Sequence, residues 1–178
     1  IRKYYYSQIT KISNNSFIID KLPSNFRWVG FIIKAFPEAK IIHIERNPMA
    51  VCWSNYKNLF LDTGLDFNLT QKDVAKYYSM YSSLMNFWNS KYKDKIFNLN
   101  YEIFVQNFEE NTKKILSFLD LRWENQLLEY QKTNRPVTPA SHQQVRGKIK
   151  KNTSEKWKIY SNYLKVMQET LTSLNIKY

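Results

Sequence analysis

One stretch of the chain joins a short apolar run to an arginine and a proline-led helical pattern: Lys40-Ile41-Ile42-His43-Ile44-Glu45-Arg46-Asn47-Pro48-Met49-Ala50-Val51-Cys52-Trp53-Ser54. Its isoleucines are β-branched and predict a buried strand over Lys40–Glu45. Pro48 suits the first position of a helix, because its missing N–H needs no partner there. Arg46 therefore lies between the carboxyl end of a strand and the N-terminus of a helix. Open α/β sheets bind ligands at that edge and helix N-termini favour anions, so the stretch predicts a phosphate site.

Two further strands and several helices are predicted around this stretch from apolar periodicity. The strands fall at Phe17–Ile19 and Ile96–Tyr101. The helices fall at Ile1–Ser13, Trp28–Phe36, Pro48–Leu61, Thr70–Lys93, Glu102–Phe108, Asn111–Leu119 and Trp123–Tyr130, and a last one is capped by Thr153 or Ser154. Residues 133–152 form a long, polar and basic loop, and loops of this length are usually functional or disordered. Strands that alternate with helices indicate an α/β fold with a parallel sheet.

The composition narrows the class of protein. A chain of 178 residues with 43% hydrophobic and 16% aromatic content is expected to form one globular domain. The net charge of +12 favours a polyanionic partner, such as a nucleotide, a nucleic acid, an acidic polymer or a membrane surface. With three glycines, the chain has no glycine-rich Walker or dinucleotide loop. Cys52 is the single cysteine, which excludes an internal disulfide and suits a reducing compartment, so we expect a cytoplasmic protein.

Other patterns are missing from the sequence. No cluster of His, Cys, Asp or Glu has metal-ligand spacing, so we expect no metal. No apolar run approaches the ~20 residues of a membrane helix, so we expect no membrane span. The sequence opens at Ile1 inside a helical pattern, and we expect it to be a fragment or a processed chain.

Four side chains outside the long loop are candidates for an anion site. Arg46 offers a planar fork of donors, and Ser54 on the following helix can donate to a second phosphate oxygen. Lys21 follows the predicted strand Phe17–Ile19 and can reach a leaving phosphate as a mobile charge. Tyr101 ends the third predicted strand, where its ring can stack on a purine. Ordinary surface side chains and a half-buried core tyrosine explain the same spacing.

The long loop and the first strand carry further candidates. Residues Ser141–Lys148 combine a hydroxyl, amides and cations, as a lid over an anion would, and a solvated basic loop is the alternative. His43 alternates with isoleucines and is predicted to be a buried or edge histidine rather than a base. Cys52 has no neighbouring motif that would make it a nucleophile.

Several segments, read in order, form a familiar series. They are Phe17-Ile18-Ile19-Asp20-Lys21-Leu22-Pro23-Ser24-Asn25-Phe26, Phe36–His43, Arg46-Asn47-Pro48 with Ser54, Tyr101–Val105, Phe118–Leu121, Thr138–Arg146 and Glu155-Lys156-Trp157. Together they resemble the sulfotransferase superfamily over nearly the whole chain. The best match is its bacterial branch linked to tetratricopeptide repeats, which is related to tyrosylprotein sulfotransferases.

The resemblance implies 3′-phosphoadenosine 5′-phosphosulfate (PAPS) as the sulfuryl donor, and a hydroxyl- or amine-bearing acceptor that the sequence does not name. Arg46 and Ser54 would hold the 3′-phosphate, and Tyr101 would lie against the adenosine. Lys21 and Ser141 would stabilise charge on the phosphosulfate bridge. Three residues of the basic loop would also bind the cofactor: Arg146, Gly147 and Lys148.

The resemblance also implies a three-layer sheet like that of the P-loop NTPases, flanked by helices and here incomplete at the N-terminus. The family's first strand ends in a Pro-Arg-Ser-Gly-Thr loop that holds the 5′-phosphosulfate, and the chain contains no such segment. Residues 1–178 are therefore interpreted as the C-terminal part of one catalytic domain, with the general base outside it. We expect weak binding of the bisphosphate product, slow or no turnover, and a free strand edge that favours a homodimer.

Two other classes of protein are compatible with parts of the sequence. A basic nucleic-acid-binding module would use the +12 charge and exposed aromatic rings. It explains the charge but not the ordered strand-turn-helix motifs. A small kinase of P-loop ancestry would share the fold and would prefer ATP to a 3′-phosphorylated nucleotide.

Overall fold

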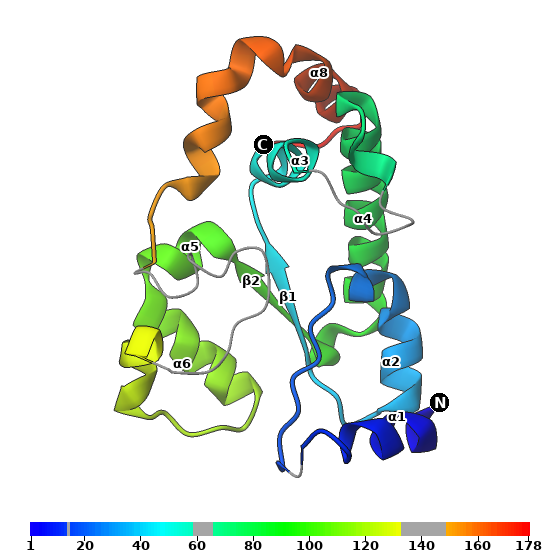
Figure 1. The fold of residues 1–178 in the computed structure, drawn as a ribbon, viewed down its shortest axis with the longest axis vertical. Helices are drawn as coiled ribbons and strands as arrows, with labels where there is room; N and C mark the ends of the chain where they lie inside the picture. The colour runs from blue at the N-terminus through cyan, green and yellow to red at the C-terminus, as the bar shows by residue number, and fades with distance from the viewer. Residues whose placement is uncertain (14, 59–65, 133–148) are drawn as a thin grey trace.

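The computed structural model describes residues 1–13, 15–58, 66–132 and 149–178, which form a helix-rich α/β fold around a small parallel sheet (Figure 1). The first half contains α1 (Arg2–Ile9), η1 (Pro23–Trp28), α2 (Val29–Ala35), β1 (Ile41–Glu45), α3 (Pro48–Tyr56), η2 (Asp66–Asn68) and α4 (Gln71–Lys91). The second half contains η3 (Lys93–Lys95), β2 (Ile96–Asn100), α5 (Tyr101–Gln106), α6 (Phe108–Phe118), η4 (Asn125–Lys132), η5 (Thr153–Tyr163) and α8 (Lys165–Ser173). The predicted α/β class is confirmed.

The sheet brings the ends of two strands to one edge. β1 and β2 are parallel, with Ile41 opposite Ile96 and Glu45 opposite Asn100. The residues that follow these strands, Arg46 and Tyr101, therefore emerge side by side. Figure 1 shows α3 directly above this edge, with α4 on one side of the strands and α5 and α6 on the other.

The turn between β1 and α3 is fixed by local hydrogen bonds. The Asn47 side chain accepts from the Ala50 backbone N–H at 3.0 Å, and Pro48 occupies the first helical position, as predicted. Asn side chains at this position satisfy donors that a helix leaves unpaired. Arg46 is thus held against a capped helix rather than in a free loop.

Apolar side chains pack into two clusters beside the sheet. One lies between α3, α4, η5 and α8; its largest fully buried side chains are Met49, Cys52, Val74, Leu164, Met167 and Leu171. The other lies between α2, α4 and β2 and contains Val29, Met85 and Ile96. The first cluster fixes η5 beside α3, and this contact sets the position of the residues at the start of η5.

Close packing joins α2 to α4 in the second cluster. A Cβ atom on Gly30 would lie 2.7 Å from Cη2 of Trp88, so only glycine fits against this ring. The Trp88 indole N–H donates to the Phe26 carbonyl at 2.9 Å and anchors the ring there.

Three sequence predictions about these elements need correction. Residues Phe17–Ile19 form no strand, because the described residues provide no partner for them; Phe17 and Ile19 are 70% and 93% exposed. β2 ends at Asn100, so Tyr101 begins α5 instead of ending a strand. The last predicted helix is divided into η5 and α8, which meet at Leu164.

The β1 part of one sheet face, and the outer edge of β1, are left uncovered by the described residues. Ile42 and Ile44 lie on the same face of β1 and are 38% and 57% exposed. The described residues contain no second partner strand for β1. Parallel sheets are normally covered on both faces.

Candidate functional site

The Arg46 side chain is anchored along one edge. Its Nε–H donates to the Ser154 hydroxyl at 3.0 Å, and Nη2 donates to the Thr153 hydroxyl at 3.3 Å. The guanidinium also lies over the Tyr101 ring, 4.8 Å from its centroid. These donors occupy the side-on edge of the guanidinium. Among the described residues, the amino group Nη1 has no hydrogen-bond partner, so the end-on pair of N–H groups can donate to two oxygens of an anion.

Glu102 links the three segments that meet at this arginine. Its Oε1 accepts from the Asn47 backbone N–H at 3.1 Å and from the Ser154 hydroxyl. Ser154 is 3% exposed, so its hydroxyl is buried between the guanidinium and the carboxylate. The turn after β1, the start of α5 and the start of η5 are therefore joined through one chain of hydrogen bonds.

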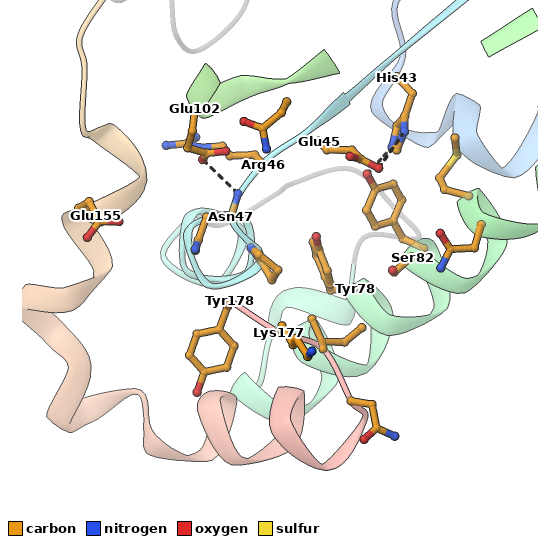
Figure 2. Close-up of a pocket in the computed structure, with 17 residues that line it drawn as sticks. His43, Glu45, Arg46, Asn47, Tyr78, Ser82, Glu102, Glu155, Lys177 and Tyr178 are labelled. Carbon is orange, nitrogen blue, oxygen red and sulfur yellow. Dashed lines mark hydrogen bonds and ion pairs between the residues drawn. The ribbon is translucent and has the colours of Figure 1, made fainter. Parts of the chain in front are cut away.

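A cavity of about 710 Å³ lies beside this cluster (Figure 2). Its walls come from the turn after β1, from α4 and from the C-terminal residues, including Tyr178. Figure 2 shows Arg46, Asn47 and Glu102 together at one end, His43 at the other end and Glu45 between them. The charged residues that line the cavity are Glu45, Arg46, Glu102, Glu155 and Lys177.

His43 is buried in the far wall of the cavity, as predicted, and is 8% exposed. Its Nδ1 is 2.8 Å from Asn98 Oδ1, and its Nε2 is bonded to the Tyr81 hydroxyl. The Asn98 amide nitrogen donates to Asn89 at 3.0 Å, so the Asn98 oxygen faces the histidine. Because that oxygen can only accept, Nδ1 carries a proton, and in the neutral imidazole Nε2 accepts from Tyr81. Burial, followed by the nearby Glu45 carboxylate, raises the pKa of Tyr81 to about 12.

The structure brings together some of the predicted site residues and not others. Arg46 and Tyr101 are in contact. Ser54 is half-buried on α3 and does not line the cavity. Lys21 is exposed in the irregular segment before η1 and does not line the cavity either. The remaining candidates, Ser141, Arg146, Gly147 and Lys148, lie outside the described residues.

Sequence reasoning missed two partners of Arg46. Thr153 and Ser154 were expected to cap a helix, but η5 follows Asn152, and neither hydroxyl caps it. Both hydroxyls instead accept from the guanidinium. A Thr-Ser pair before a helix is the usual signal for a cap, and no local pattern separates that role from arginine binding.

The residues that the structure describes support neither a cysteine nucleophile nor a metal site. The Cys52 thiol is buried, and burial raises its pKa to about 12, which leaves it protonated and unreactive. Within residues 1–13, 15–58, 66–132 and 149–178, no three His, Cys, Asp or Glu side chains gather as ligands for a metal ion.

The fold and the site define an α/β protein with an anchored arginine at the carboxyl edge of a parallel sheet. The model of the sulfotransferase family matches residues 1–125 of the chain, which is more than half of its length. The chain therefore belongs to the sulfotransferase family.

Two relatives are similar over much of the chain. An uncharacterized protein of Aquifex aeolicus (strain VF5) is 37% identical over 174 residues, which is 95% of this chain and 23% of the relative. A protein-tyrosine sulfotransferase of Drosophila melanogaster is 26% identical over 120 residues, which is 67% of this chain and 24% of the relative. The chain thus spans about a quarter of the length of these two proteins. In the part of the chain that the structure describes, no helix has both the length and the apolar character of a membrane span.

Proposed function

We propose that this chain supplies the 3′-phosphate site of a PAPS-dependent sulfotransferase. The observation that carries the proposal is the Arg46 guanidinium, fixed by Thr153 and Ser154 with its end-on donors left for an anion. A planar guanidinium matches two oxygens of a phosphate. The N-terminus of α3, which carries a partial positive charge, lies next to it.

The adenosine would lie near Tyr101. Because Arg46 covers one face of the Tyr101 ring, the purine would contact the other face or the ring edge. Ser54 would donate to a second oxygen of the 3′-phosphate. We assign the closing of the site to the loop residues Arg146, Gly147 and Lys148.

The reaction would transfer the sulfuryl group in line. An acceptor oxygen or nitrogen attacks the sulfur, the bond from sulfur to the 5′-phosphate oxygen breaks, and the acceptor loses its proton to a general base. Lys21 and Ser141 would stabilise the charge that develops on the leaving phosphate. Most of the rate enhancement in such a transfer comes from positioning and electrostatic stabilisation.

The acceptor would carry a hydroxyl or an amine. The name of the Drosophila melanogaster relative makes a tyrosine hydroxyl one candidate. The cavity beside Arg46 is a suitable place for part of the nucleotide, because it lies at the carboxyl edge of the sheet.

We also propose that residues 1–178 are one part of a three-layer, P-loop-like domain whose 5′-phosphosulfate loop lies outside them. The uncovered Ile42 and Ile44 and the unpaired edge of β1 support this proposal, because a further strand and helix would cover them. Without that segment, the free edge favours pairing with a second copy of the chain.

Calorimetry tests the proposed function against its main rival. Adenosine 3′,5′-bisphosphate should bind with micromolar to millimolar affinity, and Arg46→Ala should weaken binding by about 10- to 100-fold, because hydrogen bonds to a charged group are lost. Arg122→Ala removes an exposed arginine and the same charge, and should leave the affinity unchanged. A nucleic-acid-binding module would instead show no bisphosphate binding and a steeply salt-dependent affinity for RNA or DNA.

ATP separates the proposal from a small kinase. A kinase would prefer ATP, whereas the proposed site should prefer the nucleotide with a 3′-phosphate. Tighter binding of ATP than of adenosine 3′,5′-bisphosphate would therefore argue against a sulfotransferase site.

A further inference from the structure

We propose that Glu102 and Ser154 are positioning residues that set the Arg46 guanidinium in its end-on orientation before a 3′-phosphate arrives. This inference rests on the proposed function and adds two residues to the site. Ser154 would act by accepting from Arg46, and Glu102 by holding Ser154. Neither side chain is assigned a contact with the nucleotide.

The hydrogen bonds have a defined direction. Arg46 Nε–H donates to the Ser154 oxygen, and the Ser154 hydroxyl hydrogen is directed to the Glu102 carboxylate. The same carboxylate oxygen accepts from the Asn47 backbone N–H at 3.1 Å. The carboxylate therefore orients the serine hydroxyl so that its lone pairs face the guanidinium.

Burial makes this arrangement rigid. Ser154 is 3% exposed, and its neighbour Trp157 is 7% exposed in the cluster that packs η5 on α3. A hydroxyl in such a place cannot exchange its partners for water at low cost. Thr153 adds a second acceptor for Nη2 and also meets the Tyr101 hydroxyl at 3.3 Å. The side-on edge of Arg46 is therefore occupied by protein groups before any ligand binds.

Preorganisation of this kind reduces the entropy lost on binding, because the long arginine side chain is already immobilised. It also selects the binding mode. With Nε and one Nη2 hydrogen in use, the remaining donors form the end-on fork, and this fork matches two oxygens of one phosphate.

The direction in which Glu102→Ala changes the nucleotide affinity distinguishes positioning from simple charge effects. Glu102 brings a negative charge close to the proposed phosphate. If charge alone mattered, Glu102→Ala would tighten the binding of adenosine 3′,5′-bisphosphate. The positioning role of Glu102 predicts the opposite: binding should weaken about threefold to tenfold, because Ser154 loses its orienting acceptor. Glu102→Gln keeps an oxygen acceptor and should recover at least part of the affinity.

The test uses calorimetry on the full chain with adenosine 3′,5′-bisphosphate. Ser154→Ala should weaken binding about threefold to tenfold in the native background and leave it unchanged in the Arg46→Ala background, since it acts only through that side chain. Ser83→Ala, an exposed serine on α4, is the matched control and should have no effect. Urea denaturation of every variant confirms that each remains folded under the conditions of the titration.

Three outcomes decide the inference. Weakening by Ser154→Ala and Glu102→Ala that disappears without Arg46 supports it. Normal affinity in Ser154→Ala, tighter binding in Glu102→Ala, or a loss that persists in Arg46→Ala overturns the inference and leaves the proposed function intact. If the native chain binds no bisphosphate at all, the proposed function fails, and the inference fails with it.

Discussion

Gly30→Ala should destabilise the protein although alanine is the better helix former. The new methyl group would lie 2.7 Å from Cη2 and 2.9 Å from Cζ3 of Trp88. The ring cannot retreat easily, because its N–H is bonded to the Phe26 carbonyl and its plane stacks on Tyr92. Overpacking of this kind costs about 3 kcal/mol at its upper range, and the alanine gains about 1 kcal/mol in helix propensity. We expect a net loss of about 2 kcal/mol.

Urea denaturation followed by tryptophan fluorescence and circular dichroism measures this loss. The control is the same substitution in a Trp88→Leu background, where the clash is removed and Gly30→Ala should become stabilising by about 1 kcal/mol. A native-background Gly30→Ala variant that is as stable as the parent, or more stable, would show that α2 and α4 do not pack as described.

Three further predictions concern the buried groups. Tyr81→Phe removes the donor to His43 Nε2 and should lower the free energy of unfolding by about 1–3 kcal/mol; an unchanged urea midpoint would refute that bond. Burial raises the pKa of Tyr81 from its usual 10.0 to about 12, so its ionisation opposes folding. Stability should be intact below pH 10 and fall as the pH rises towards about 12, and the fall should be shallower in Tyr81→Phe. Burial likewise raises the pKa of Cys52 to about 12, so a thiol reagent at pH 8 should react with Cys52 only as fast as the protein unfolds. Rapid labelling of the native protein would contradict the burial of that side chain.

The parts of the fold that the sequence predicts well are those with strong local signals. The isoleucines of β1 and the proline of α3 fix a strand and a helix start within a few residues. Thr70 is an N-cap, as predicted, and accepts from the Asp73 N–H at 3.0 Å. Such features depend on neighbours in sequence, so no tertiary information is needed to find them.

The strand predicted at Phe17–Ile19 shows the limit of such signals. An apolar run has strand propensity, but a strand exists only where a neighbouring backbone provides its hydrogen bonds. Among the described residues, no backbone pairs with this run. The sequence pattern alone cannot report that condition.

The candidate site was predicted in part for the same reason. Arg46 was predicted to follow one strand and Tyr101 to end another, and parallel strands bring residues at their carboxyl ends together. Ser154 was missed as a partner because it is 108 residues from Arg46 in sequence. Its place is set by the packing of η5 on α3, which is a property of the folded core rather than of any short motif.

The central claim is that Arg46 binds a 3′-phosphate. The most direct measurement is the ratio of the affinities for two nucleotides, one with this phosphate and one without it. Calorimetry would compare adenosine 3′,5′-bisphosphate with adenosine 5′-monophosphate, which differ only in that group, in the native chain and in Arg46→Ala. The native chain should prefer the bisphosphate by about tenfold or more, and Arg46→Ala should lose that preference. A native chain without the preference, or an Arg46→Ala variant that keeps it, would contradict the claim.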